Sequence, residues 1–290
     1  MSPKIAAAPI SWGVCEVPGW GHVLDAKTVL GEMASLGVQA TELGPPEYLP
    51  TDPAELRELL GGYGLSMVGG FLAVPLHTGA QSTVDEAERT AKLLAATGAE
   101  VLVLAAATGL DGYDDRPKLT DEEWATLVET AARIRDIAAA QGLRTVLHPH
   151  VGTHVENAEE VDRFLADSDL ELCLDTGHLL IGGTDPVELA RKYADRIGHM
   201  HLKDVRADIA ERVQRGELPY AKAVGEGIYV PLGDGDVDIA GIVAFLREAG
   251  YDGWWVLEQD TALQVGDAEA AGRPVRDTER SLQYLGKQFD

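Results

Sequence analysis

The chain has 290 residues and carries 48 acidic against 24 basic side chains, a formal net charge of −24 at pH 7. Such acidity argues against nucleic-acid binding, which needs a basic surface, and against attachment to anionic membranes. Two cysteines cannot build a disulfide framework, and no apolar run approaches the roughly 18 residues of a membrane span. We expect a soluble globular protein of the cytoplasm that binds a small molecule and has no nucleic-acid or membrane partner.

Short apolar runs alternate with stretches of helical periodicity along the whole chain. Strands are expected at residues 5–10, 38–43, 65–74, 101–106, 145–148, 170–174, 197–202 and 254–257. Helices are expected at residues 25–36, 51–60, 83–96, 121–140, 156–165, 186–193, 237–249 and 278–287. The second helix illustrates the boundaries: Thr51-Asp52-Pro53 caps its start, and Gly61-Gly62 is predicted to end it.

Eight strand–helix units, with no linker between them, predict an α/β protein with a single (β/α)8 TIM-barrel domain over residues 1–290. The alternative is a doubly wound open sheet, which would need a glycine-rich phosphate-binding turn after an early strand. We find no such turn in the sequence, so the barrel is favoured. The long polar excursion over residues 205–233, after the seventh strand, is expected to form a lid or an interface.

Histidines and acidic side chains collect where the predicted strands end, which in a barrel is the face that carries the active site. The residues at these ends are Glu42, His77, His148, His150, Asp175, His178, His199, His201, Lys203, Asp204, Glu258 and Asp260. Strands five to eight would each contribute one inward ligand to a divalent metal: His148, Asp175, His201 and Glu258. Imidazole with carboxylate suits Mn, Co, Fe or Zn, whereas an all-oxygen set would suit Mg or Ca better.

Each of these residues also has a structural interpretation when it is taken alone. A histidine at a strand end is often a hydrogen-bonding residue, Asp175 could cap a turn, and Glu258 could be a solvated strand end. Together these interpretations would require a coincidence on four successive strands. His199 and His201 alternate along one strand and therefore point the same way, so one can bind metal while the other contacts substrate. Trp12, beside Gly13 at the mouth of the first strand, is either a platform for a sugar ring or simple packing.

The motifs around these residues resemble those of the xylose-isomerase-like TIM-barrel superfamily, over residues from about 5 to 260. Two of them are widespread in that superfamily and indicate the fold and the metal: Leu174-Asp-Thr-Gly-His and His199-Met-His-Leu-Lys-Asp. Three narrower motifs resemble the inosose dehydratase branch: Ala8-Pro-Ile-Ser-Trp-Gly-Val, Thr41-Glu-Leu-Gly-Pro and Gly227-Ile-Tyr-Val-Pro-Leu-Gly-Asp-Gly. His148 stands where many members of the superfamily have a glutamate ligand. A neutral imidazole in place of this carboxylate would make the ion more Lewis-acidic.

The resemblance implies a divalent-metal-dependent dehydratase, a lyase that acts on a keto-cyclitol or keto-sugar such as 2-keto-myo-inositol through a metal-stabilised enediolate. Mn or Co is the expected ion, with Mg, Fe or Zn as alternatives. Glu42, His150 and His178 are the candidate bases or proton shuttles, and Lys203 would hold substrate oxygens or act as an acid if its pKa falls. Trp12, His199 and Asp204 are expected to contact the substrate.

Two other functions remain open at this point. Reprotonation of the enediolate on the neighbouring carbon would make the same site a sugar isomerase or a ketose 3-epimerase. A non-catalytic sugar-binding barrel is the alternative of another class, but it would be expected to have lost Asp175, His201 or Glu258, and all three are present. The resemblance also suggests a homodimer or homotetramer, and the net charge argues against the DNA-repair branch of the superfamily.

Overall fold

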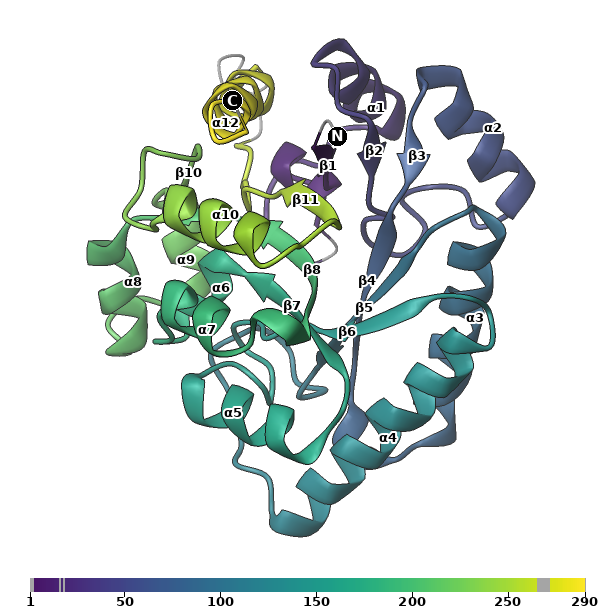
Figure 1. The fold of residues 1–290 in the computed structure, drawn as a ribbon, viewed down its shortest axis with the longest axis vertical. Helices are drawn as coiled ribbons and strands as arrows, with labels where there is room; N and C mark the ends of the chain where they lie inside the picture. The colour runs from purple at the N-terminus through teal and green to yellow at the C-terminus, as the bar shows by residue number, and fades with distance from the viewer. Residues whose placement is uncertain (1–2, 16, 18, 265–271, 290) are drawn as a thin grey trace.

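The computed structural model describes residues 3–15, 17, 19–264 and 272–289. Parallel strands form one sheet in the order β3-β2-β1-β11-β8-β7-β6-β5-β4, surrounded by helices (Figure 1). The strands are β1 Lys4–Ala7, β2 Ala40–Thr41, β3 Ser66–Met67, β4 Gly69–Val74, β5 Val101–Ala106, β6 Arg144–Leu147, β7 Glu171–Asp175, β8 Ile197–Leu202 and β11 Trp254–Leu257. The predicted TIM barrel is therefore confirmed.

The sheet closes into a barrel at Val68, which separates β3 from β4. The Val68 N–H donates to the carbonyl oxygen of Thr41 at 3.0 Å, and its own carbonyl oxygen accepts from the Glu100 N–H at 2.8 Å. Because β3 pairs with β2 and β4 pairs with β5, the two segments are one bent strand that joins both edges of the sheet. The barrel thus has the eight strand positions that the sequence predicts.

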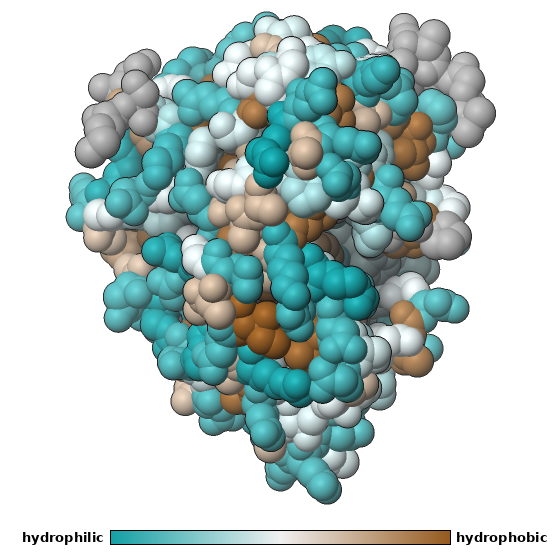
Figure 2. Space-filling model, turned by 90° about the vertical axis from the view of Figure 1, so that its right-hand side faces the viewer, coloured by the Kyte–Doolittle hydropathy of each residue, from teal (hydrophilic) through white to brown (hydrophobic). Residues whose placement is uncertain are grey.

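The helices form the outer layer of the barrel (Figure 1). Eight of them follow the strands as predicted: α1 Ala26–Ser35, α2 Pro53–Tyr63, α3 Gln81–Ala96, α4 Asp121–Ala139, α5 Ala158–Asp167, α7 Pro186–Lys192, α10 Ile239–Glu248 and α12 Arg273–Gly286. All six residues of β5 are buried, which explains why this strand is a continuous apolar run without alternation. The face drawn in Figure 2 is mostly hydrophilic, with only small apolar areas.

Some element boundaries differ from the predictions for identifiable physical reasons. The first strand ends at Ala7, because Pro9 starts the short 3-10 helix η1 (Pro9–Trp12). The predicted stop at Gly61-Gly62 is wrong: α2 continues to Tyr63 and ends at Gly64, whose φ of 70° only glycine adopts readily. The last helix begins at Arg273, five residues before its predicted start at 278. No helix among the described residues is long and apolar enough to cross a membrane.

The excursion after the seventh strand is an ordered substructure. It contains α8 Ala207–Gln214, α9 Tyr220–Gly225 and a small antiparallel pair of strands, β9 Asp204–Val205 and β10 Tyr229–Val230. A further short helix that the sequence did not predict, α6 Thr176–Ile181, directly follows β7 and packs against α8. These additions lie at the carboxyl ends of β7 and β8, the face on which the predicted site residues gather.

Candidate metal centre

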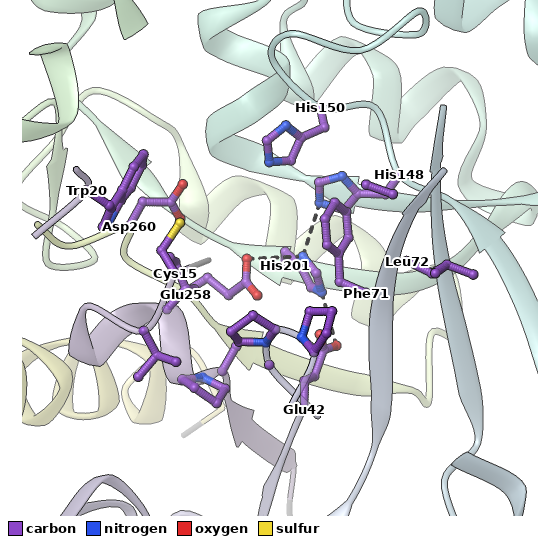
Figure 3. Close-up of a pocket in the computed structure, with 18 of the residues that line it drawn as sticks. Cys15, Trp20, Glu42, Phe71, Leu72, His148, His150, His201, Glu258 and Asp260 are labelled. Carbon is purple, nitrogen blue, oxygen red and sulfur yellow. Dashed lines mark hydrogen bonds and ion pairs between the residues drawn. The ribbon is translucent and has the colours of Figure 1, made fainter. Parts of the chain in front are cut away.

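The four predicted ligands come together at the carboxyl ends of β6, β7, β8 and β11. His201 Nδ1 lies 3.2 Å from His148 Nε2, 3.5 Å from Asp175 Oδ2 and 3.2 Å from Glu258 Oε2. His148 Nε2 is in turn 3.2 Å from Asp175 Oδ2. Figure 3 shows His201 between His148 and Glu258, with Glu42 on its other side.

These four separations are close to those expected of atoms that share one metal ion. Bonds of about 2.0–2.2 Å from nitrogen and oxygen ligands in a tetrahedral site place neighbouring donors roughly 3.3–3.6 Å apart. The donor set of two imidazoles and two carboxylates, all buried or nearly so, suits a divalent transition ion. A divalent metal ion therefore fits the residues at this position.

Two neighbouring groups of potential ligands fit an ion less well. In the first, His199 Nε2 lies 2.8 Å from Glu42 Oε1, which is a hydrogen-bond distance and too close for two ligands of one ion. In the second, Cys173 joins His148 and His201. Burial raises the pKa of the Cys173 thiol to about 11, and the thiolate is the form that binds metal. The set of His148, Asp175, His201 and Glu258 is the best candidate.

Asp175 is held in place by the start of α6. Its Oδ1 accepts the backbone N–H groups of Gly177 at 3.0 Å and His178 at 2.8 Å, which leaves Oδ2 facing the other donors. Burial alone would raise the pKa of Asp175, but the charge of Lys203, the nearby His178 and hydrogen bonds outweigh it and hold the pKa well below its usual range. The carboxylate is therefore ionised and ready to bind a cation.

Gly177 is needed in this turn because α6 and β8 approach each other very closely. A Cβ at residue 177 would lie 2.6 Å from Lys203 Cβ and 2.9 Å from Tyr229 Cε1, closer than real side chains come. Thr176 ties the same two segments together, since its hydroxyl donates to the Lys203 carbonyl at 2.6 Å and accepts the Lys203 N–H at 2.9 Å. The Asp-Thr-Gly-His motif thus places a carboxylate and locks a lysine beside it.

Lys203 lies beside the four donors as a buried cation. Its Nζ is 2.7 Å from Asp260 Oδ1, 3.0 Å from Glu258 Oε2 and 3.4 Å from Asp175 Oδ2. Burial lowers the pKa of Lys203, but these carboxylates raise it well above its usual value, so the ammonium is retained. The sequence analysis expected Lys203 to act as an acid if its pKa were lowered. The pKa is raised instead, because three carboxylates surround the amine.

His178 supports Lys203 from the side. Its Nε2 lies 2.9 Å from Lys203 Nζ, and because an ammonium can only donate, this nitrogen must accept. Burial, together with His150 and Lys203, lowers the pKa of His178 well below its usual value, so the ring is neutral. The His150 ring lies against it, with centroids 3.7 Å apart.

His150 is a neutral histidine at the cavity wall. Burial lowers the pKa of His150 to about 3, helped by the neighbouring His148 and Lys203. Its Nδ1 lies 2.7 Å from the carbonyl oxygen of Val151, so Nδ1 carries the proton and Nε2 keeps a lone pair. Nε2 is therefore the atom of His150 that can accept a proton, as a weaker base than an ordinary histidine because its pKa is lowered.

The excursion contributes two tyrosines that sequence reasoning missed. The Tyr220 hydroxyl donates to Asp260 Oδ2 at 2.9 Å, and the Tyr229 hydroxyl lies 2.9 Å from that of Tyr220. Both rings are buried, and Asp260 in turn holds Lys203. Asp260 could have been selected as a functional residue, because it stands at the end of the eighth strand. The tyrosines carried no such signal, since a polar stretch without periodicity does not reveal what it packs against.

A cavity of about 170 Å³ opens beside the four donors. Its polar lining includes Glu42, His148, His150, His201, Lys203, Glu258 and Asp260. Apolar residues lie among them: Trp20 next to Asp260, Phe71 next to His148, and Leu72 (Figure 3). A compact ring with polar edges and apolar faces matches this mixed lining.

Comparison with known proteins assigns the family. Residues 30–287 match the family profile of xylose isomerase-like TIM barrels. A curated relative, the inosose dehydratase of Geobacillus kaustophilus, is 39% identical over 277 residues, which cover 90% of this chain and 89% of that protein. The chain belongs to the xylose isomerase-like TIM barrel family.

Two solved structures share the fold of this xylose isomerase-like barrel. The IOLI protein, solved with a bound zinc atom, has a TM-score of 0.71 and 16% identity, and the match covers 99% of each chain. The D-allulose 3-epimerase from Methylomonas sp. also has a TM-score of 0.71, at 19% identity over 99% of this chain and 98% of that chain. Similarity at these identities shows the fold alone.

Three residues expected to contact substrate in this xylose isomerase-like barrel do not reach the cavity. Trp12 is fully buried, and its indole N–H donates to Glu32 Oε2 at 2.8 Å, so Trp20 is the tryptophan available to a ring. The Asp204 carboxylate instead accepts the backbone N–H groups of Val205, Gly233, Gly235 and Val237. These hydrogen bonds hold residues 233–237, where the chain leaves the excursion, against β9. His199 is buried and bonded to Glu42.

Proposed function

We propose that the protein is a divalent-metal-dependent dehydratase that acts on a keto-cyclitol, with 2-keto-myo-inositol as its substrate. The observation that carries the proposal is that three of the four candidate metal ligands, His148, His201 and Glu258, line the same cavity as the neutral imidazole of His150 and the ammonium of Lys203. The fourth, Asp175, lies 3.4 Å from Lys203 Nζ. Removal of water from a hydroxyketone needs these functions together: a cation for the carbonyl, a base for the α-proton and an acid for the leaving hydroxyl. The relatives named inosose dehydratase support the same reaction.

His148, Asp175, His201 and Glu258 would hold the ion. When bound, the ion supplies Lewis acidity, which polarises the ketone and makes the neighbouring C–H group acidic. The two carboxylates and two neutral imidazoles would leave the centre without net charge around a divalent cation, so it keeps its capacity to attract an oxygen ligand.

The proton transfers are proposed for two residues of the cavity wall. His150 Nε2, which has a free lone pair, takes the proton from the carbon next to the ketone. Lys203 Nζ gives a proton to the hydroxyl on the following carbon as its C–O bond breaks, and water leaves while a C=C bond forms. Hydroxide is a very strong base, so even a lysine of raised pKa can protonate it. His178 and Asp260 hold Lys203 in place.

Trp20 and Phe71 are proposed to pack against the substrate ring. A cyclitol presents C–H groups on its faces and hydroxyls around its edge, and aromatic side chains bind such apolar faces. Both rings line the cavity, and Phe71 lies 5.5 Å from the rings of His148 and His150, measured between centroids. This arrangement would direct the ketone and its neighbouring hydroxyl toward the metal centre.

The experiment follows ultraviolet absorbance while metal-loaded protein is incubated with 2-keto-myo-inositol. A dehydratase forms a conjugated product, and absorbance rises with time in the wild type but not in Asp175→Asn. Flat absorbance, together with interconversion of ketoses in a sugar panel, would instead identify an isomerase or epimerase and overturn the proposal.

The ion, the compartment and the assembly are further proposals. We propose Mn or Co as the native ion, because the mixed imidazole–carboxylate set suits them, with elemental analysis of purified protein as the test. A cytoplasmic location is supported by the low cysteine content of the chain, Cys15 and Cys173. A homodimer or homotetramer, with the outer surface of the excursion as interface, is tested by light scattering.

A further inference from the structure

Glu42 contacts the metal centre through two histidines of β8. Its Oε1 lies 2.8 Å from His199 Nε2 and 3.1 Å from His201 Nε2. The contact crosses the barrel interior, because β2 and β8 are separated in the sheet by β1 and β11. All three side chains are buried, with Glu42 only 2% exposed. A single carboxylate oxygen thus serves two imidazoles.

The direction of these hydrogen bonds determines which nitrogen of His201 is available to an ion. A carboxylate oxygen can only accept, so His199 and His201 must both carry a proton on Nε2. By the same reasoning, Nδ1 also carries a proton while it faces the carboxylates of Asp175 and Glu258. A bound ion would replace that proton and take the Nδ1 lone pair, because Nε2 keeps its hydrogen toward Glu42. In the opposite tautomer, Nδ1 would keep its hydrogen and could not bind an ion.

We propose that Glu42 is a positioning residue of the metal centre and does not serve as the catalytic base. It keeps the Nε2–H tautomer of His201 and the plane of its ring, while His199 holds Glu42 from the other side. The inference rests on the proposed metal-dependent function. It replaces the sequence-based expectation of Glu42 as a base: Glu42 lines the cavity, but its Oε1 already accepts N–H groups from both His199 and His201.

Metal binding and histidine tautomers test this role without any substrate. We would compare Glu42→Ala and Glu42→Gln with Glu58→Ala, a control that removes an exposed carboxylate of α2. Affinity for Co²⁺ and Zn²⁺ is measured by competition with a chelating dye. Glu42→Ala is expected to lose about 10–100-fold in affinity, as when a residue that orients a metal ligand is removed. Glu42→Gln keeps a carbonyl acceptor and should recover part of that loss, while the control matches the wild type.

Nitrogen-15 NMR of labelled histidines provides the second readout. Zinc-loaded wild type should show His201 as the Nε2–H tautomer with a metal-shifted Nδ1, and Glu42→Ala should broaden or shift this signal. Unchanged affinity and an unchanged tautomer in Glu42→Ala, with turnover abolished, would overturn the proposal and make Glu42 a base. If Glu42→Ala does not fold, the near-isosteric Glu42→Gln carries the same comparison. A wild type that binds no metal would refute the proposed function itself.

Discussion

Gly177→Ala tests the physical reason for the glycine in the Asp-Thr-Gly-His motif. The added Cβ would lie 2.6 Å from Lys203 Cβ, whereas ordinary contact begins at 3.4 Å, so α6 and β8 must separate by about 0.8 Å. Overpacking of this kind costs about 1–3 kcal/mol. For a domain of this size, the corresponding decrease in Tm is roughly 2–10 °C. Displacement of Lys203 by most of an ångström should also lower kcat by about a hundredfold.

The assay combines thermal unfolding with turnover of 2-keto-myo-inositol. Gly61→Ala is the matched control, because Gly61 lies in helix α2 and a Cβ there meets nothing within 4 Å. Alanine is the better helix former by about 0.8–1.0 kcal/mol, so this control should raise Tm slightly and leave kcat unchanged. If Gly177→Ala melts and turns over like the wild type, the close approach of α6 to β8 does not explain the glycine.

Three further predictions concern the excursion, the ion and a buried histidine. Tyr220→Phe removes a hydrogen bond to the Asp260 carboxylate, of a kind that contributes about 1.5–3 kcal/mol, and should lower kcat at least about tenfold with metal content unchanged. Tyr193→Phe, which removes a similar bond to Asp162 away from the site, should leave kcat unchanged; equal effects of both variants would contradict the role of Tyr220. Chelation of the ion should lower the Tm of the wild type but not that of Asp175→Asn, because an ion that binds only the folded state stabilises that state. A wild-type Tm that does not respond to chelator would contradict the proposed metal centre. Burial, together with His77 and Arg116, lowers the pKa of His154 from 6.5 to about 4. Between pH 6.5 and about 4, the unfolded chain therefore binds a proton that the folded chain does not, and the free energy of unfolding decreases as the pH falls. His154→Gln should therefore lose Tm less steeply than the wild type over this range, and parallel curves would show that another group is responsible.

The sequence was sufficient to predict the barrel and the grouping of the candidate ligands at one face of it, because both follow from simple periodic rules. Buried parallel strands read as apolar runs, as in β5, and their carboxyl ends must meet on one face. His148, Asp175, His201 and Glu258 are therefore neighbours in any barrel with this strand order. The prediction that His199 and His201 point the same way also follows from strand alternation, since both reach Glu42.

Positions that depend on loops and side-chain packing could not be predicted in this way. Trp12 stands at a strand end, yet η1 turns its ring into the interior, and Trp20 lines the cavity in its place. Asp204 follows the seventh strand, but both of its carboxylate oxygens accept hydrogen bonds from backbone N–H groups of the excursion. Tyr220 reaches the site because the excursion folds back toward Asp260, and no local periodicity of the sequence indicates that path.

The most direct test of the proposed reaction is a mass-spectrometric time course of 2-keto-myo-inositol with the metal-loaded protein. We expect each substrate molecule to lose the mass of one water, at a rate that Asp175→Asn abolishes. A substrate that keeps its mass while its ring protons exchange with solvent deuterium, or while an isomer accumulates, would contradict dehydration by this centre.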